Sequence, residues 1–139
     1  MDINLIIDTS VAVKWLELEG EEYTGEAKIL LKNIVNGKIR VATLDLLMVE
    51  YTNALHKGKK FTEKQISDSL IRLTSLPIKF IPISLALLED AVKLAIRFDQ
   101  TIYDALYLSL AKSFHCKVVT SDRELSKVAS FSTHLNRYK

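Results

Sequence analysis

The chain has 139 residues, of which 48% are hydrophobic and 26% are charged, and its formal net charge is +2. These values are typical of a globular protein with a full core, so we expect one domain over residues 1–139. They exclude a membrane protein, because no apolar stretch approaches the roughly 20 residues that cross a bilayer. The apolar run at 3–7 is too short for a signal peptide, and the lone Cys116 cannot form an internal disulfide. Both features favour a cytoplasmic location.

Runs of apolar residues and helical periodicities predict strands and helices in alternation. In chain order, we expect a strand at 3–7, a helix at 9–16, a helix at 26–35, a strand at 39–42, a helix at 45–56, a helix opened by the capping box at 62–65, a strand at 77–83, a helix at 84–98, a helix at 101–112, a strand at 117–120, a helix at 123–129 and a short strand within 131–139. Pro77 and Pro82 favour an edge position for the third strand. The alternation predicts an α/β fold with a parallel sheet covered on both faces.

Four acidic residues stand where the surrounding pattern is that of a core. Asp8 and Asp122 each follow a short apolar run and lie at the carboxyl ends of expected strands. Glu50 and Asp104 each interrupt an apolar helical stretch. Carboxylates are seldom buried unless they are paired, hydrogen-bonded or bound to a metal. Because ligands of parallel sheets gather at the carboxyl ends of the strands, we expect one acidic pocket there.

Each acid also has a simpler interpretation. Asp8 would cap the helix that follows it, and Asp122 the helix that ends at residue 129. Thr101 and Asp104 have the spacing of a Thr-x-x-Asp capping box. Glu50 lies in mid-helix, where the alternative is a glutamate at the boundary of the core whose carboxylate reaches water. These alternatives are independent of one another, whereas one pocket explains all four acids together.

An acidic pocket of this kind favours hard metal ions. Carboxylates within a few ångströms repel one another unless a cation enters, and Mg²⁺ prefers oxygen ligands. A pair of such ions activates water and stabilises the departing oxygen of a phosphodiester. The three histidines are widely spaced and there is one cysteine, so no cluster favours a softer metal.

Four motifs, taken in order and spacing, resemble those of a PIN domain of the VapC toxin type over almost the whole chain. The motifs are Ile6–Ser10, an apolar strand that ends in Asp; Glu50–Leu55, a Glu followed by Asn and Leu; Tyr103–Ala111; and Val119–Asp122. The resemblance implies a three-layer α/β/α sandwich with a central, mainly parallel sheet. The tail after Ala129 departs most from the family pattern.

The resemblance also implies a Mg²⁺- or Mn²⁺-dependent endoribonuclease, the toxin of a toxin–antitoxin pair. Carried over residue by residue, the catalytic and metal-binding residues are Asp8, Glu50, Asp104 and Asp122. Asp8 and Asp104 would be the strongest direct ligands, and Ser10 and Thr120 would orient carboxylates or metal-bound water. The implied partners are the RNA substrate, a cognate antitoxin that holds the enzyme inactive, and a second copy in a homodimer.

Two other functions share parts of this pattern. A phosphotransfer receiver or an aspartate-nucleophile phosphatase has a second acid close to the first strand-end Asp, but here Thr9, Ser10 and Val11 follow Asp8. A catalytically silent RNA-binding or scaffold subunit would keep the fold, and the presence of all four acids counts against it.

Basic and aromatic residues offer weaker indications. The basic segment 56–60 either holds RNA phosphates or forms a solvated helix end, and Gly58 with its neighbouring cations favours the helix end. Trp15, Tyr51, Tyr103 and Tyr107 either stack on bases or pack in the core. The apolar helices on which they lie favour the core.

Overall fold

The structure, a computed structural model, describes residues 2–16 and 18–138. Its strands are β1 (Leu5–Ile7), β2 (Val41–Leu44), β3 (Ile78–Ile81), β4 (Lys117–Thr120) and β5 (Ser132–His134). Its helices are α1 (Thr9–Lys14), α2 (Thr24–Val35), α3 (Leu46–Asn53), α4 (Glu63–Ser75), α5 (Leu85–Phe98), α6 (Ile102–Ser113) and α7 (Arg123–Ser126), with a π-helical turn η1 (Ala54–Gly58) and a 3₁₀ turn η2 (Leu135–Arg137). The alternation of strands and helices is the one that the sequence predicts.

The five strands form one sheet in the order β3-β2-β1-β4-β5, and every pair is parallel. The central strands β1 and β4 are short and apolar because both of their faces are covered. β3 lies at one edge, as its flanking prolines predict. Because all strands run in one direction, the residues that follow β1, β2 and β4 meet at a single edge of the sheet.

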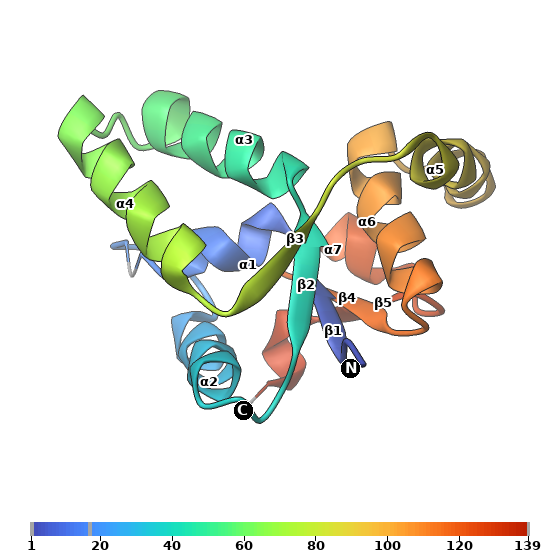
Figure 1. Ribbon diagram of the computed structural model, residues 1–139, viewed down its shortest axis with the longest axis horizontal. Helices are drawn as coiled ribbons and strands as arrows, with labels where there is room; N and C mark the ends of the chain where they lie inside the picture. Colours follow the sequence, from blue (N-terminus) through green and yellow to red (C-terminus); the bar gives the residue numbers. More distant parts are fainter. Residues whose placement is uncertain (1, 17, 139) are drawn as a thin grey trace.

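Helices cover both faces of the sheet, which makes the three-layer α/β/α sandwich (Figure 1). On one side, α6 packs against β1, β2 and β4, and α5 packs on the outside of α6. On the other side lie α1 and α2, with α3 and α4 beyond them (Figure 1). Residues Ala105–Ala111 of α6 are all buried, because this helix lies between the sheet and α5. No helix in the described parts of the chain is long and apolar enough to cross a membrane.

Local capping explains where several helices begin. Thr62 accepts a hydrogen bond from the amide of Gln65, and the side chain of Gln65 accepts one from the amide of Thr62, so the capping box is confirmed. Ser84 caps α5, and Thr101 caps α6 by accepting a hydrogen bond from the amide of Asp104. The Thr101 cap thus fixes the start of α6 and places Asp104 in its first turn.

Some predicted boundaries are wrong. The second strand is 41–44 and not 39–42, because the amide of Ile39 still donates to the carbonyl of Asn33, whereas residues 41–44 pair with residues 78–81 of β3. α2 begins at Thr24, before the predicted residue 26, and α7 ends at Ser126 rather than at 129.

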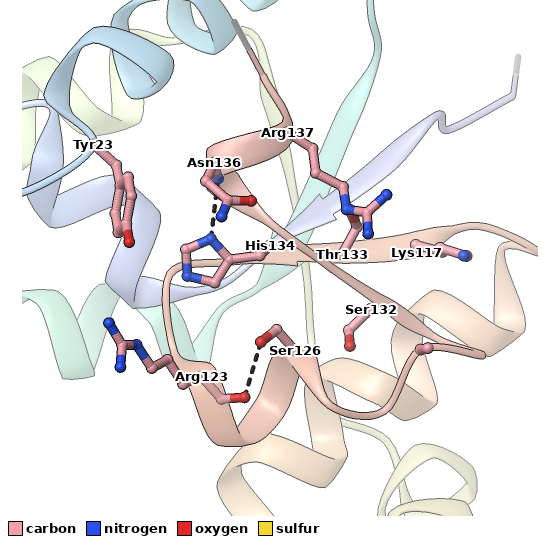
Figure 2. Close-up of a pocket in the computed structure, with 10 residues that line it drawn as sticks. Tyr23, Lys117, Arg123, Ser126, Ser132, Thr133, His134, Asn136 and Arg137 are labelled. Atoms are coloured by element: carbon pink, nitrogen blue, oxygen red, sulfur yellow. Dashed lines mark hydrogen bonds between the residues drawn. The ribbon is translucent and has the colours of Figure 1, made fainter.

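The predicted strand in the tail is confirmed as β5, which pairs with β4. β5, α7 and the turn η2 surround a pocket at this edge of the sheet (Figure 2). β5 is the edge strand at one end of the strand order, and β3 is the edge strand at the other end.

Candidate functional site

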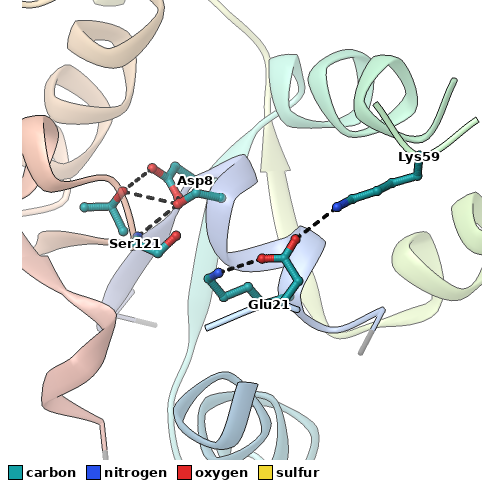
Figure 3. A network of polar contacts seen from close by, with 7 residues as sticks. Asp8, Glu21, Lys59 and Ser121 are labelled. Carbon is teal, nitrogen blue, oxygen red and sulfur yellow. Dashed lines mark hydrogen bonds and ion pairs between the residues drawn. The ribbon is translucent and has the colours of Figure 1, made fainter. Parts of the chain in front are cut away.

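Asp8 lies at the carboxyl end of the central strand β1 and is only 6% exposed. Since Ile7 stands opposite Val119, the next residues Asp8 and Thr120 lie side by side. The Thr120 hydroxyl donates to Asp8 Oδ2 at 2.5 Å, and the Ser10 hydroxyl donates to Oδ1 at 2.6 Å. Asp8 stands at the N-cap position of α1, but its two carboxylate oxygens are held by the hydroxyls of Ser10 and Thr120, so helix capping does not account for its placement. Figure 3 shows this carboxylate beside Ser121, whose amide donates to Ser10 Oγ at 3.0 Å.

The environment of Asp8 opposes its negative charge. The pKa of Asp8 is raised from 3.8 to about 6, mainly by burial and to a smaller extent by the charge of Asp104. Hydrogen bonds from Ser10 and Thr120, with the nearby Val11 amide, oppose this rise without cancelling it. A buried carboxylate held in place and short of compensating positive charge is a group that a cation would stabilise.

Glu50 projects from α3 toward the same edge and is held by two hydroxyl groups. The Tyr107 hydroxyl donates to Glu50 Oε1 at 2.7 Å, and the Thr9 hydroxyl donates to the same oxygen at 2.9 Å. Burial raises the pKa of Tyr107, and the Glu50 carboxylate adds to this rise, so the phenol remains a proton donor. Glu50 therefore bonds to side chains of α1 and α6, which excludes the interpretation that its carboxylate simply reaches water.

Asp104 lies in the first turn of α6, and its backbone amide donates to the Thr101 hydroxyl at 3.1 Å. The Thr101 hydroxyl also interacts with the Asp104 carboxylate and opposes the rise of its pKa, and among the described residues this carboxylate has no other hydrogen-bond partner. Burial raises the pKa of Asp104, and the charges of Asp122 and Glu50 raise it further. Asp104 therefore lies within electrostatic reach of the other three acids.

Asp122 follows β4 and caps the short helix α7. Its Oδ1 accepts a hydrogen bond from the amide of Glu124 at 2.9 Å, so the capping interpretation is confirmed for this residue. Its own amide donates to the Thr120 hydroxyl at 3.0 Å, and that hydroxyl in turn donates to Asp8. Capping thus fixes Asp122 close to the Asp8 network and does not remove it from this edge.

The four acids share one edge and influence one another, but they are not in contact. In the parts of the chain that the structure describes, no group of three or more His, Cys, Asp or Glu side chains is placed to hold a metal ion. Hydrogen bonds hold Asp8, Glu50 and Asp122 in separate positions, as expected of carboxylates that repel one another. The donor atoms are all oxygens, which fits a hard divalent ion.

Two residues of this site were not expected from the sequence. Thr9 would have been interpreted as a helix cap, and Tyr107 as a core residue, yet both bond to Glu50. A signal was present for Tyr107, because it stands one helical turn after Asp104 and so shares its face of α6.

The aromatic predictions hold in part. Tyr51 and Tyr107 are buried, and Trp15 is half-buried and donates to the carbonyl of Ala27. The prediction is wrong for Tyr103, which is 61% exposed. Position 103 lies on the outer face of the first turn of α6, before the helix enters the space between sheet and α5.

The basic segment 56–60 forms a helix end that is tied to the loop before α2. Helical backbone ends at Gly58, as predicted, and Lys59 forms an ion pair with Glu21 at 3.3 Å (Figure 3). The buried Lys14 also pairs with Glu21, at 3.0 Å. These two pairs tie η1 and α1 to the loop before α2, which lies beside the acidic edge.

Comparisons with known proteins agree with the fold. The model of the PIN domain family matches residues 5–130. Ribonuclease VapC3 of Pyrobaculum aerophilum is 30% identical over 130 residues, which cover 90% of this chain and 94% of that protein. The crystal structure of PAE2754 from the same organism superposes with a TM-score of 0.73 at 22% identity and covers 99% of this chain and 94% of that one. A toxin–antitoxin complex from Klebsiella pneumoniae has a TM-score of 0.70 at 18% identity, covering 94% of this chain and 97% of that one. The chain therefore belongs to the PIN domain family, in its VapC type.

Proposed function

We propose that the protein is a Mg²⁺- or Mn²⁺-dependent endoribonuclease whose catalytic residues are Asp8, Glu50, Asp104 and Asp122. The observation that carries this proposal is Asp8, a buried carboxylate with a raised pKa at the carboxyl edge of the sheet, near three further acids. The family model and the similarity to a ribonuclease support the same conclusion.

Asp8 and Asp104 would hold the cation, with Glu50 and Asp122 completing an all-oxygen site. The bound ion supplies an activated water molecule and stabilisation of the negative charge that develops on the phosphate. Ser10 and Thr120 keep both oxygens of Asp8 in fixed directions. Thr9 and Tyr107 occupy one oxygen of Glu50 and leave the other without a partner among the described residues.

The reaction is hydrolysis of an RNA phosphodiester. Water adds to the scissile phosphorus, a carboxylate of the site takes the proton of that water, and the bond from phosphorus to the departing ribose oxygen breaks. The departing ribose oxygen takes a proton from solvent water as it leaves, and the carboxylate then releases the proton of the attacking water to solvent, so that atoms and charge balance. Glu50 has a carboxylate oxygen free for such a proton.

Removal of divalent cations is expected to abolish the activity. Purified protein should cut single-stranded RNA when Mg²⁺ or Mn²⁺ is present and stop when EDTA is added, because the carboxylates alone repel both one another and the phosphate. Cleavage is measured on a labelled RNA by gel electrophoresis. Cleavage that continues in EDTA would refute the metal mechanism, and RNA that is bound without being cut would favour a silent RNA-binding subunit.

The protein is proposed to be the toxin of a toxin–antitoxin pair. The support is its VapC type, together with the similarity of its fold to a chain of a toxin–antitoxin complex. The expected partner is a cognate antitoxin that holds the nuclease inactive.

We also infer a homodimer through the outer face of α5. This helix buries Ala91, Leu94 and Ala95, whereas its outer face carries four exposed apolar residues. They are Leu85, Leu88, Val92 and Ile96, which are 72%, 37%, 42% and 79% exposed. Their helical spacing makes one apolar stripe, and a second copy of the chain offers the same stripe in return.

Introducing a charge into this stripe should separate the dimer. For Ile96→Glu we expect the dimer dissociation constant to rise at least tenfold, because each partner would bury a carboxylate against apolar surface. Val35→Glu, on the exposed side of α2, is the matched control and should leave the dimer intact. Sedimentation velocity measures both variants, and an unchanged dimer of Ile96→Glu would show that this face is not the interface.

A further inference from the structure

The edge strand β5 lines a pocket of about 470 Å³ that is separate from the acidic edge (Figure 2). Five elements supply its principal polar side chains. They are Tyr23 at the start of α2, Lys117 on β4, Arg123 on α7, and His134, Asn136 and Arg137 on β5 and η2. We call this site the β5 pocket.

The β5 pocket is positively charged. No Asp or Glu lines it. Among the described residues, the side chains of Lys117, Arg123 and Arg137 form no ion pair or hydrogen bond, although five lysines elsewhere are paired with acids. Those lysines are Lys14, Lys59, Lys64, Lys112 and Lys127. Three uncompensated cations around one cavity attract an anion, and guanidinium groups bind phosphate in a bidentate manner.

His134 adds an oriented hydrogen-bond donor. Its Nδ1 accepts a hydrogen bond from the amide of Asn136 at 3.0 Å. In the neutral imidazole the proton is then on Nε2, which can donate. Figure 2 shows this second ring nitrogen on the side of Tyr23 and Arg123, so it faces the pocket between them.

Tyr23 forms a wall of the pocket from a strained position. Its φ of 60° lies in the left-handed region, which is rare for an aromatic residue and unfavourable for its backbone. Its ring meets that of His134 edge to face at 5.0 Å, and Lys14 Nζ lies 5.9 Å from the ring centroid. Strain of this kind persists where the surroundings fix the residue, and it is frequent at binding sites.

A second, smaller cavity shares lining residues with the β5 pocket. This cavity measures about 280 Å³, and Tyr23 and Arg123 line both spaces. It is also lined by Ser121, whose amide bonds to Ser10, the partner of Asp8. Arg123 itself follows directly after Asp122. Glu21 and Glu22 also line this smaller cavity, and Glu21 is neutralised by its ion pairs with Lys14 and Lys59. A polyanion with one phosphate at the acids can therefore extend along Arg123 into the β5 pocket.

We propose that the β5 pocket binds a backbone phosphate of the RNA strand outside the scissile bond, through Arg123, His134 and Arg137. This inference rests on the proposed ribonuclease function, because it places the same substrate on a second site. The pocket raises the affinity for RNA without taking part in the bond-breaking step. Phosphate contacts position the strand and carry no sequence preference.

The anion site itself is tested with inorganic phosphate. In ¹H–¹⁵N spectra that observe arginine side chains and the His134 ring, phosphate should cause saturable shifts of Arg123, Arg137 and His134 in the native protein. In Arg137→Gln, a change away from the acids, the phosphate-induced shifts of Arg123 and His134 should be lost. In Arg40→Gln these shifts should be kept. Arg40 is an exposed arginine at the opposite end of β2 whose side chain lines neither cavity. Shifts that do not saturate would overturn the anion site.

The assignment to RNA is tested by binding in an Asp8→Asn background, which prevents cleavage. The pair of changes Arg123→Gln and Arg137→Gln should weaken binding of a single-stranded RNA about tenfold, as measured by fluorescence anisotropy. The slope of log affinity against log salt should become shallower by about 0.7, because the protein no longer neutralises one phosphate of the single strand. Arg40→Gln should change neither quantity.

The outcomes separate this inference from the proposed function. If the native protein binds and cuts RNA, but the changes Arg123→Gln and Arg137→Gln alter neither the affinity for RNA nor the salt slope, the assignment of the β5 pocket to RNA is overturned. The proposed nuclease function then stands. Weakened binding of an acidic peptide, with RNA binding intact, would overturn it in favour of a protein partner. A native protein that binds phosphate in the β5 pocket but neither binds nor cuts RNA would overturn the proposed function and the RNA assignment together.

Discussion

Asp104→Asn is expected to lower metal-dependent RNA cleavage by roughly a hundred- to a thousandfold while the fold remains intact. Among the described residues the Asp104 carboxylate interacts by hydrogen bond only with Thr101, and its charge reaches Asp8, Glu50 and Asp122. On the proposed function, Asn at this position removes a charged cation ligand, while its amide can still bond to the Thr101 hydroxyl. Initial rates of RNA cleavage in Mn²⁺, with circular dichroism to verify the fold, measure the effect.

Asp99→Asn is the matched control for this variant. Asp99 is exposed at the end of α5, in a left-handed conformation that asparagine also adopts readily. The same chemical change should therefore leave both fold and cleavage unaltered. Cleavage by Asp104→Asn at the native rate would remove Asp104 from the site.

Asp8→Asn is expected to make the metal-free protein more stable at pH 7.5. The rise of the Asp8 pKa from 3.8 to about 6 corresponds to about 3 kcal/mol of stability that is present below pH 3.8 and lost as the pH rises through 6. The loss arises because the unfolded chain ionises Asp8 more readily than the folded protein does. Asparagine carries no charge, and its amide can still bond to the hydroxyls of Ser10 and Thr120.

The measurement is the difference in unfolding free energy between Asp8→Asn and the native protein, from urea denaturation in EDTA. The variant should be more stable by up to about 3 kcal/mol at pH 7.5 and equally stable at pH 3.5. Taking this difference cancels other titrations, such as that of Glu21, whose pKa is lowered by its hydrogen bond with Lys14. A variant no more stable than the native protein at pH 7.5 would mean that the Asp8 charge is compensated.

The sequence was most informative at the ends of the central strands. A short apolar run followed by a polar residue places Asp8 and Asp122 at the carboxyl edge of a parallel sheet, and the order β3-β2-β1-β4-β5 brings them together. The prolines beside β3 predict its edge position for a backbone reason, because proline cannot donate to a neighbouring strand.

The side-chain contacts between elements that are distant in the sequence could not be predicted from the sequence. Glu50 bonds to Thr9 and Tyr107, which are 41 and 57 positions away. These bonds depend on how α1, α3 and α6 are oriented, and hydrophobic periodicity fixes orientation only to within a face. The exposure of Tyr103 has the same origin, since only the part of α6 beyond its first turn lies under α5.

The β5 pocket shows a related limit. Its cations come from β4, α7 and the tail, where the chain departs most from the family pattern. Separately, Lys117, Arg123 and Arg137 look like ordinary surface cations, and only the pairing of β5 with β4 gathers them around one cavity.

The central claim is that four distant carboxylates form one cation site. The most direct measurement is the anomalous scattering of Mn²⁺ in crystals of the native protein grown with that ion. The account predicts a peak between Asp8 and Asp104, within coordination distance of both, that disappears in Asp104→Asn. A protein that cuts RNA in Mn²⁺ while its peak lies elsewhere, or that shows no peak at saturating Mn²⁺, would contradict it.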